Sequence, residues 1–129
     1  MLNTKTQSDE KVIHKELSYI VTGILFDAHN ELGRFAKEKQ YGDFIETKLI
    51  ETKIPYQREL TIGNSGNTPD FNIDDKIIIE LKGKPYLTDK DYSQIKRYLH
   101  TCNLDLGILV NFREITLKPR RVLNQMKNL

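Results

Sequence analysis

The sequence has few of the features of secreted, disulfide-bonded or membrane proteins. Cys102 is its only cysteine, so the chain can form neither an intrachain disulfide nor a cysteine-based zinc site. Its uninterrupted apolar runs, such as residues 77–79, are far shorter than the roughly 20 residues of a bilayer-spanning helix. The polar segment 1–10 lacks the apolar stretch of a secretory signal. We therefore expect a cytoplasmic protein that does not bind a membrane.

Neither sign of charge dominates the chain. Twenty Lys and Arg residues stand against eighteen Asp and Glu residues, a net charge of +2, which is too even to indicate nucleic-acid binding by itself. Hydrophobic residues make up 38% and charged residues 29%, which excludes both a disordered chain and a membrane protein. The length of 129 residues predicts one domain over residues 11–129, after a flexible N-terminus at 1–10.

The spacing of apolar residues predicts an α/β chain. Apolar side chains recur every three or four residues, which predicts a helix over 11–31 that stops at Gly33 and a second that ends near Lys53, before Pro55. A capping box, in which the carboxylate of Asp91 follows Thr88 by three residues, predicts a third helix over 88–101. β-branched, alternating or continuous apolar runs predict strands at 56–62, 70–73, 76–82 and 106–111, with a further edge strand at 115–122, and turns at 63–67 and 74–75.

The densest group of chemically active residues lies on the second and third predicted strands. Glu80 and Lys82 are two residues apart, so their side chains point to one face of the sheet. A hairpin turning at residues 74–75 would bring Asp70 near Glu80. Two adjacent carboxylates repel each other, but together they suit Mg²⁺, which prefers oxygen ligands. The alternative is an exposed edge strand whose charges are solvated, although the isoleucines that precede Glu80 indicate a central strand.

Two helical pairs accompany this group. Gln94 and Tyr98 lie four residues apart on one face of the third predicted helix, where an amide and a hydroxyl could bind a phosphate or a metal-bound water; alternatively they are a surface glutamine and a core tyrosine. Glu38, near the start of the second helix, could reach a metal or only interact with the helix dipole. Tyr41 fits the apolar face of that helix and is expected in the core.

The ordered motifs together resemble the PD-(D/E)XK nuclease superfamily. The carrying residues are Pro69-Asp70, Glu80-Leu81-Lys82 ten residues later, and a QxxxY motif from Gln94 to Tyr98 that resembles the RecB-like branch. More narrowly, the chain is similar to the GxxExxY family. It departs from the naming motif at one position, because Phe35 stands where the motif has glycine, three residues before Glu38. The stretches that carry this second resemblance are 29–33, 38–41, 54–56 and 109–112.

The resemblance implies a restriction-endonuclease-like αβββαβ core with an extra N-terminal helix, in which helices flank a mixed central sheet. It also implies a Mg²⁺- or Mn²⁺-dependent phosphodiesterase that acts on DNA or RNA. Asp70, Glu80 and the backbone carbonyl of Leu81 would hold the metal, with Glu38 as an outer ligand. Lys82 would position or activate the attacking water, and Gln94 and Tyr98 would orient Lys82 or the scissile phosphate.

Lys84, Lys96, Arg97 and Arg113 are candidate phosphate contacts. Two alternatives to a nuclease remain open at this point. The chain could be a non-catalytic module that binds nucleic acid or a partner and keeps the nuclease fold. It could also be a homodimeric accessory subunit that contributes its site to a larger complex, because a chain of this size offers little groove for a duplex.

Overall fold

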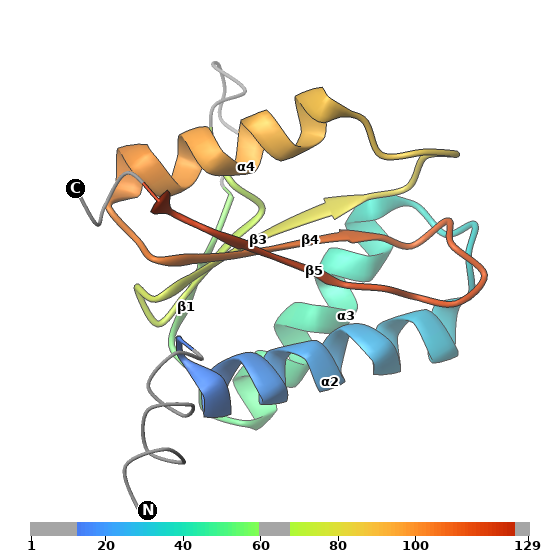
Figure 1. Ribbon diagram of the computed structural model, residues 1–129. Helices are drawn as coiled ribbons and strands as arrows, with labels where there is room; N and C mark the ends of the chain where they lie inside the picture. The colour runs from blue at the N-terminus through green and yellow to red at the C-terminus, as the bar shows by residue number, and fades with distance from the viewer. Residues whose placement is uncertain (1–12, 60–67, 126–129) are drawn as a thin grey trace, which may run out of the picture.

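The computed structural model describes residues 13–59 and 68–125, and Figure 1 follows the chain through its helices and strands. Within these residues two helices precede three strands, and a third helix precedes two more strands. This order confirms the predicted α/β fold with an additional N-terminal helix. The predicted flexible N-terminus at 1–10, the turn at 63–67 and positions 60–62 of the first predicted strand lie outside the described residues.

Two helices begin the described chain. Helix α2 (Lys15–Leu32) ends at Gly33, whose φ of 77° is the left-handed backbone that stops a helix, as predicted. Helix α3 (Glu38–Glu51) buries Tyr41, Ile45 and Leu49 against the core. No helix in the described segments is long and apolar enough to cross a membrane.

Five strands form one mixed sheet in which the spatial order follows the order along the chain. The first three strands pair antiparallel, in keeping with the predicted turn at residues 74–75 between the second and the third. Helix α4 (Asp89–Cys102) then connects the third strand to a parallel fourth strand, and the fifth returns antiparallel. The strands are β1 (Tyr56–Arg58), β2 (Phe71–Ile73), β3 (Ile77–Lys82), β4 (Leu106–Asn111) and β5 (Arg120–Leu123).

The turn between β2 and β3 determines which residues face each other across the hairpin. Asp74 and Asp75 have φ angles of 52° and 54°, and the N–H of Lys76 donates to the carbonyl oxygen of Ile73 over 2.9 Å. Aspartate tolerates this left-handed conformation better than most residues, which suits it to a tight hairpin turn. The resulting register pairs Phe71 with Ile79, so the residue before β2 lies opposite Glu80.

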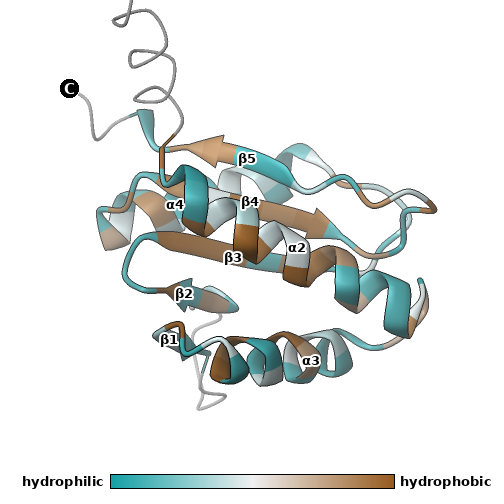
Figure 2. Cartoon of the chain, turned by 90° about the horizontal axis from the view of Figure 1, so that it is seen from below, coloured by the Kyte–Doolittle hydropathy of each residue, from teal (hydrophilic) through white to brown (hydrophobic). Residues whose placement is uncertain are grey.

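The sheet lies between two helical layers. Figure 1 shows α4 on one face of the sheet and both α2 and α3 on the other. Successive side chains of β3 alternate between these layers: Ile77 and Ile79 pack toward α2 and α3, whereas Ile78 packs toward α4. Both faces of the two central strands are therefore apolar, and β3 and β4 are brown over most of their length in Figure 2.

The structure corrects the boundaries of the two outer strands. Strand β1 ends at Arg58, and residue 59 carries no strand structure, so the part of the predicted 56–62 strand that is described is shorter than expected. The predicted edge strand at 115–122 instead begins at Arg120, after Pro119. Proline supplies no N–H to a ladder. Leu117 is buried in the loop before the strand, which explains why the alternation of apolar residues there misled the prediction.

Candidate active site

The end of β3 places one basic and one acidic side chain beneath α4. Glu80 and Lys82 continue the alternation that directs Ile78 toward α4, so both side chains lie on that face. Glu80 is only 4% exposed. A carboxylate this deeply buried is costly unless it is paired, which makes its partners the first question about the site.

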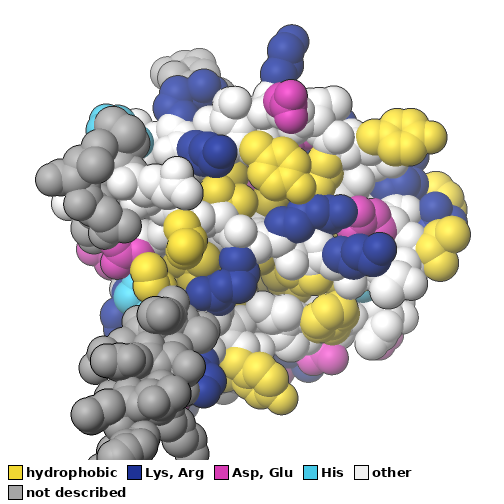
Figure 3. Space-filling view, viewed as in Figure 1, with side chains coloured by type: hydrophobic (Ala, Val, Ile, Leu, Met, Phe, Trp, Pro, Cys, Tyr) yellow, Lys and Arg dark blue, Asp and Glu magenta, His cyan; other side chains and the backbone are white. Residues whose placement is uncertain are grey.

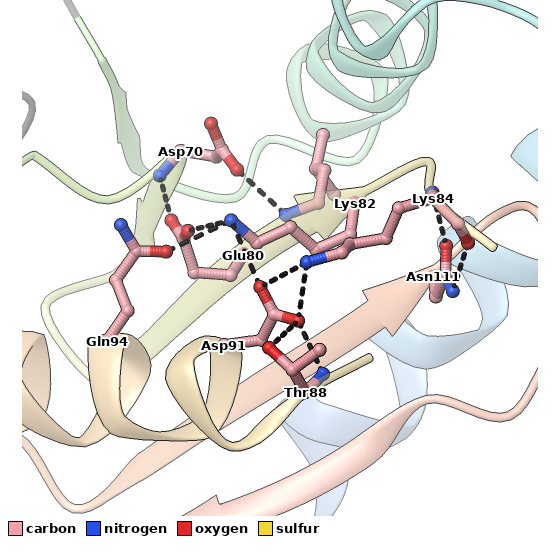
Figure 4. A network of polar contacts seen from close by, with 9 residues as sticks. Asp70, Glu80, Lys82, Lys84, Thr88, Asp91, Gln94 and Asn111 are labelled. Atoms are coloured by element: carbon pink, nitrogen blue, oxygen red, sulfur yellow. Dashed lines mark hydrogen bonds and ion pairs between the residues drawn. The ribbon is translucent and has the colours of Figure 1, made fainter. Parts of the chain in front are cut away.

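Asp70 forms a reciprocal pair of hydrogen bonds with the end of β3 (Figure 4). The backbone N–H of Asp70 donates to Oε1 of Glu80 over 2.9 Å. In return, Oδ2 of Asp70 accepts the backbone N–H of Leu81 over 2.7 Å. The hairpin register thus brings Asp70 and Glu80 together, as the sequence predicted.

Burial and nearby negative charge make both carboxyls weaker acids. Burial is the main cause that raises the pKa of Asp70 to about 6; the hydrogen bond from Leu81 opposes the rise, and the charges of Glu38 and Glu59 add to it. Burial and then the charge of Asp70 raise the pKa of Glu80 to about 8. A divalent cation between the two carboxylates would relieve this repulsion.

Lys82 lies at the centre of the polar network. Its Nζ donates to Oε1 of Gln94 over 3.0 Å. The same nitrogen lies 3.8 Å from Oε2 of Glu80 and 3.9 Å from Oδ1 of Asp91. Two carboxylates and an amide therefore hold the Lys82 side chain beside the acidic pair.

Helix α4 provides the other wall of the site. Gln94 and Tyr98 lie on the helix face that packs on β3, and Tyr98 is 4% exposed. Burial, followed by the negative charges of Glu80 and Asp70, raises the pKa of Tyr98 to about 12. The Tyr98 hydroxyl is therefore a hydrogen-bond donor at neutral pH.

Sequence reasoning assigned Asp91 only to the helix cap and overlooked its place in the site. Asp91 is 5% exposed, and its Oδ2 accepts both the backbone N–H of Thr88 over 2.7 Å and Nζ of Lys84 over 2.9 Å. The signal was present, because Asp91 precedes Gln94 by three residues and so shares its helix face.

Asn111 was also overlooked. It ends β4 opposite Lys82, and its side-chain amide bonds both backbone groups of Lys84: Oδ1 accepts the N–H over 3.1 Å and Nδ2 donates to the carbonyl over 2.8 Å. The amide therefore fixes the chain directly after Lys82. A buried polar residue at the end of a strand in the run 106–111 was the available signal.

Glu38 lies on the other side of the acidic pair. It begins α3, which packs on the sheet face opposite α4. A cleft of about 420 Å³ contains Glu38 together with Glu59, Asp70 and Leu81. Sequence reasoning missed Glu59. This residue directly follows β1, and its backbone N–H donates to the carbonyl oxygen of Asp70 over 3.1 Å.

The donor set fits a hard divalent cation with a small number of protein ligands. Among residues 13–59 and 68–125, no three Asp, Glu, His or Cys side chains lie close enough to form a metal-binding group. The pair of Asp70 and Glu80 satisfies the requirement of Mg²⁺, which is held by one or two carboxylates and otherwise by water and substrate oxygens.

The four predicted phosphate contacts have different surroundings. Lys96 and Arg97 are exposed on α4. The ammonium group of Lys84 is instead held by Asp91. Arg113 is half-buried, and its Nη2 donates to the carbonyl of Gly83 over 3.1 Å, which anchors it next to Lys82.

Comparison with known proteins identifies the family. No curated protein and no solved structure matches the chain significantly. A family model of the PD-(D/E)XK nuclease superfamily matches residues 15–122. This span contains the whole polar network from Glu38 to Asn111. The chain therefore belongs to the PD-(D/E)XK nuclease superfamily.

Proposed function

We propose that the protein is a metal-dependent nuclease that hydrolyses phosphodiester bonds of DNA or RNA. The observation that carries the proposal is that Glu80 accepts the N–H of Asp70, Asp70 accepts the N–H of Leu81, and Lys82 lies beside Glu80. Two carboxyls whose pKa values are raised mainly by burial cost the fold stability, and a bound cation would compensate them. Membership of a nuclease superfamily supports the same chemistry.

Asp70, Glu80 and the backbone carbonyl of Leu81 would hold Mg²⁺ or Mn²⁺. The N–H of Leu81 points to Asp70, and the N–H and carbonyl of one strand residue face the same edge. The Leu81 carbonyl therefore belongs to the edge at which Asp70 lies. Glu38, across the cleft, would act through a water molecule. The bound ion would supply Lewis acidity to the phosphate and lower the pKa of a coordinated water.

The side chains of this site would orient the reactants. Gln94 holds Nζ of Lys82, so the ammonium can donate to an attacking water or to a phosphate oxygen. Tyr98, whose raised pKa keeps its hydroxyl protonated well above neutral pH, can donate to the same phosphate. Asp91 offsets part of the positive charge of Lys82 and Lys84. Such preorganised donors stabilise charge that develops in the transition state.

We also propose that the chain lies within the GxxExxY family and the RecB-like branch. The support is the QxxxY motif, whose Gln94 contacts Lys82. Tyr41, in the stretch 38–41, supports it too: this residue is buried and its ring stacks on Phe112 with the centroids 3.9 Å apart.

The single cysteine favours a reducing, cytoplasmic location.

The test combines calorimetry with cleavage. Mg²⁺ and Mn²⁺ are titrated into wild type, Glu80→Gln and the control Asp27→Asn, which removes an exposed carboxylate of α2. Single- and double-stranded DNA and RNA are then incubated with each protein in the same buffers. We expect wild type and Asp27→Asn to bind metal and to cleave at least one substrate, and Glu80→Gln to do neither.

Two other outcomes would change the assignment. Cleavage by Glu80→Gln at the wild-type rate would refute the proposed site. Wild-type protein that binds no metal and cleaves nothing, but binds nucleic acid in a salt-sensitive way, would favour the non-catalytic binding module instead.

A further inference from the structure

Three loops meet beside the proposed active site and form a second cleft. They are the segments 33–37 before α3, 83–88 after β3 and 112–119 after β4. The cleft has a volume of about 610 Å³. Figure 1 shows the three loops together at one end of the molecule, and Figure 3 shows hydrophobic and basic side chains gathered at that end. The lining includes Arg34, Phe35, Tyr86, Arg113, Ile115 and Lys118.

The aromatic rings of this cleft face solvent. Phe35 is 71% exposed and Tyr86 80%. Large exposed apolar side chains that gather in one place mark a binding surface rather than ordinary surface residues. The guanidinium carbon of Arg34 lies 4.9 Å from the centre of the Phe35 ring, and that of Arg113 lies 5.2 Å from it. Planar cations and an aromatic ring therefore share one patch.

The cleft carries net positive charge. Arg34, Arg113 and Lys118 line it together with a single carboxylate, Glu114. That carboxylate is already paired, because Nη2 of Arg120 lies 2.7 Å from its Oε2. A ligand in the cleft would therefore meet cations whose charge this carboxylate offsets only in part.

The walls of the cleft are held by hydrogen bonds between two of the loops and between one loop and α2. Nε of Arg34 donates to the carbonyl of Arg113 over 2.7 Å. The His29 ring on α2 lies 2.8 Å from the carbonyl oxygen of Glu114. Binding therefore requires little ordering of the loops, which favours affinity.

The cleft lies close to the proposed active site. Arg113 donates to the carbonyl of Gly83, the residue that directly follows Lys82. Pro85 lines the cleft and is three residues from Lys82, at most roughly 11 Å away along an extended chain. One nucleic-acid strand could therefore occupy both places.

We propose that this cleft binds an unpaired nucleobase of a single strand, with its phosphates on the basic side chains. Exposed rings interleaved with arginine are the chemistry that stacks unpaired bases without regard to sequence. A blunt duplex keeps its bases stacked inside and cannot offer them to Phe35 or Tyr86. This inference rests on the proposed nuclease function and names its substrate as a single strand or a frayed end.

The test measures binding without cleavage. Fluorescence anisotropy in EDTA is used with single-stranded DNA, single-stranded RNA and a blunt DNA duplex of one sequence. We expect Phe35→Ala to weaken binding of a single strand by about 5- to 150-fold, the effect of losing one base stacked on a ring. Phe35→Tyr should restore the affinity, and binding of the duplex should not change.

Tyr19→Ala is the matched control, because Tyr19 is 81% exposed on α2, away from the three loops. If Phe35→Ala weakens binding of both the DNA and the RNA strand, the cleft recognises the base alone. If it weakens binding of only one of them, the cleft recognises the base and also distinguishes the sugar of that strand. The inference is overturned if Phe35→Ala binds single strands like wild type, if Tyr19→Ala shows the same loss, or if wild type prefers the duplex. Binding that depends on Phe35 in a protein that never cleaves would overturn the nuclease proposal alone.

Discussion

At the scale of single residues, the site depends on charges placed in an apolar strand. Strand β3 is otherwise isoleucine and leucine, and Glu80 is buried with Asp70 as its close neighbour. The charge of Asp70 raises the cost of ionising Glu80. The protein thus accepts a local loss of stability, which is expected where a cation or substrate later provides the missing positive charge.

This arrangement predicts a stability that falls as pH rises when no metal is present. Because the pKa of Glu80 is raised in the folded protein, the folded state holds the proton more tightly than the unfolded chain, and stability is lost between about pH 4 and pH 8. Glu80→Gln removes the charge and should be more stable than wild type at pH 8 by about 1 kcal/mol or more, the equivalent of one pKa unit.

Urea unfolding in EDTA at pH 5 and pH 8 measures this difference, with Asp27→Asn as the control that should follow wild type. Equal pH slopes in wild type and Glu80→Gln would contradict it. Adding saturating Mg²⁺ at pH 8 should stabilise wild type and leave Glu80→Gln unchanged, because only a protein that binds the ion gains from it.

The contact of Gln94 with Lys82 predicts that Gln94 positions the Lys82 side chain for cleavage. Gln94→Ala frees Nζ of Lys82 from its 3.0 Å partner, and a misplaced catalytic group should slow cleavage by about 10- to 100-fold. Metal affinity measured by calorimetry should not change, because Asp70 and Glu80 remain. Ser93→Ala, one residue away and exposed, is the control. Loss of metal binding in Gln94→Ala would contradict this role.

At the scale of elements, α4 is both part of the core and a wall of the site. Its first turn is fixed by Asp91, and its apolar face packs on β4 at Gly107. Whatever shifts this helix moves Gln94 and Tyr98 relative to β3. The packing of α4 and the geometry of the site should therefore change together.

Asp91→Ala should lower the free energy of unfolding by about 1–3 kcal/mol, since the Thr88 N–H and the Lys84 ammonium lose their acceptor. Although burial raises the pKa of Asp91, the bonds from Thr88 and Lys84 outweigh it and the pKa is lowered. The stabilisation is therefore present at neutral pH and lost as pH falls below about 4. Denaturant unfolding at neutral pH and below about pH 4 tests this prediction, with the exposed Asp89→Ala as the control. Equal losses of unfolding free energy in Asp91→Ala and Asp89→Ala at neutral pH would contradict it.

Gly107 allows α4 to approach the sheet. A Cβ at this position would lie 2.7 Å from Cδ1 and 2.9 Å from Cγ1 of the buried Ile95. Gly107→Ala should therefore destabilise the fold by about 1–3 kcal/mol. Gly23→Ala, at an open position of α2, should instead stabilise by about 0.5–1 kcal/mol. Thermal unfolding compares the two, and a stable Gly107→Ala would show that the packing is looser than described.

At the scale of the whole molecule, the distribution of charge matters more than its sum. The net charge is only +2, yet three basic side chains and one paired carboxylate line the cleft where the three loops meet. A nearly neutral protein can thus present a positive surface to a nucleic acid while the rest of its surface remains mixed.

If Arg34, Arg113 and Lys118 each contact one phosphate, binding of a single strand should weaken with salt at a slope of about −2 in log K against log [salt]. Anisotropy over a NaCl series in EDTA measures the slope. Lys118→Gln should reduce its magnitude by about 0.7, whereas Lys53→Gln, at the far end of α3, should leave it unchanged. A slope near zero in wild type would contradict a phosphate-binding surface.

The sequence alone determined the order of helices and strands and the composition of the core, because hydrophobic periodicity is a local property. The spacing of Glu80 and Lys82 and the turn at 74–75 also predicted the acidic pair, since a hairpin register follows from its turn. The extent of β5 was not predictable from the residues around Pro119, because Leu117 is buried by a loop rather than by a strand.

Only the tertiary structure decided which distant residues meet. Asp91 and Asn111 join the site through the packing of α4 and the parallel pairing of β4, which are contacts between segments distant in the chain. The separation of Glu38 from Glu80 follows from the position of α3 on the opposite face of the sheet. The cleft around Phe35 exists because three loops far apart in the chain meet at one end of the sheet, where the parallel strands β3 and β4 both finish.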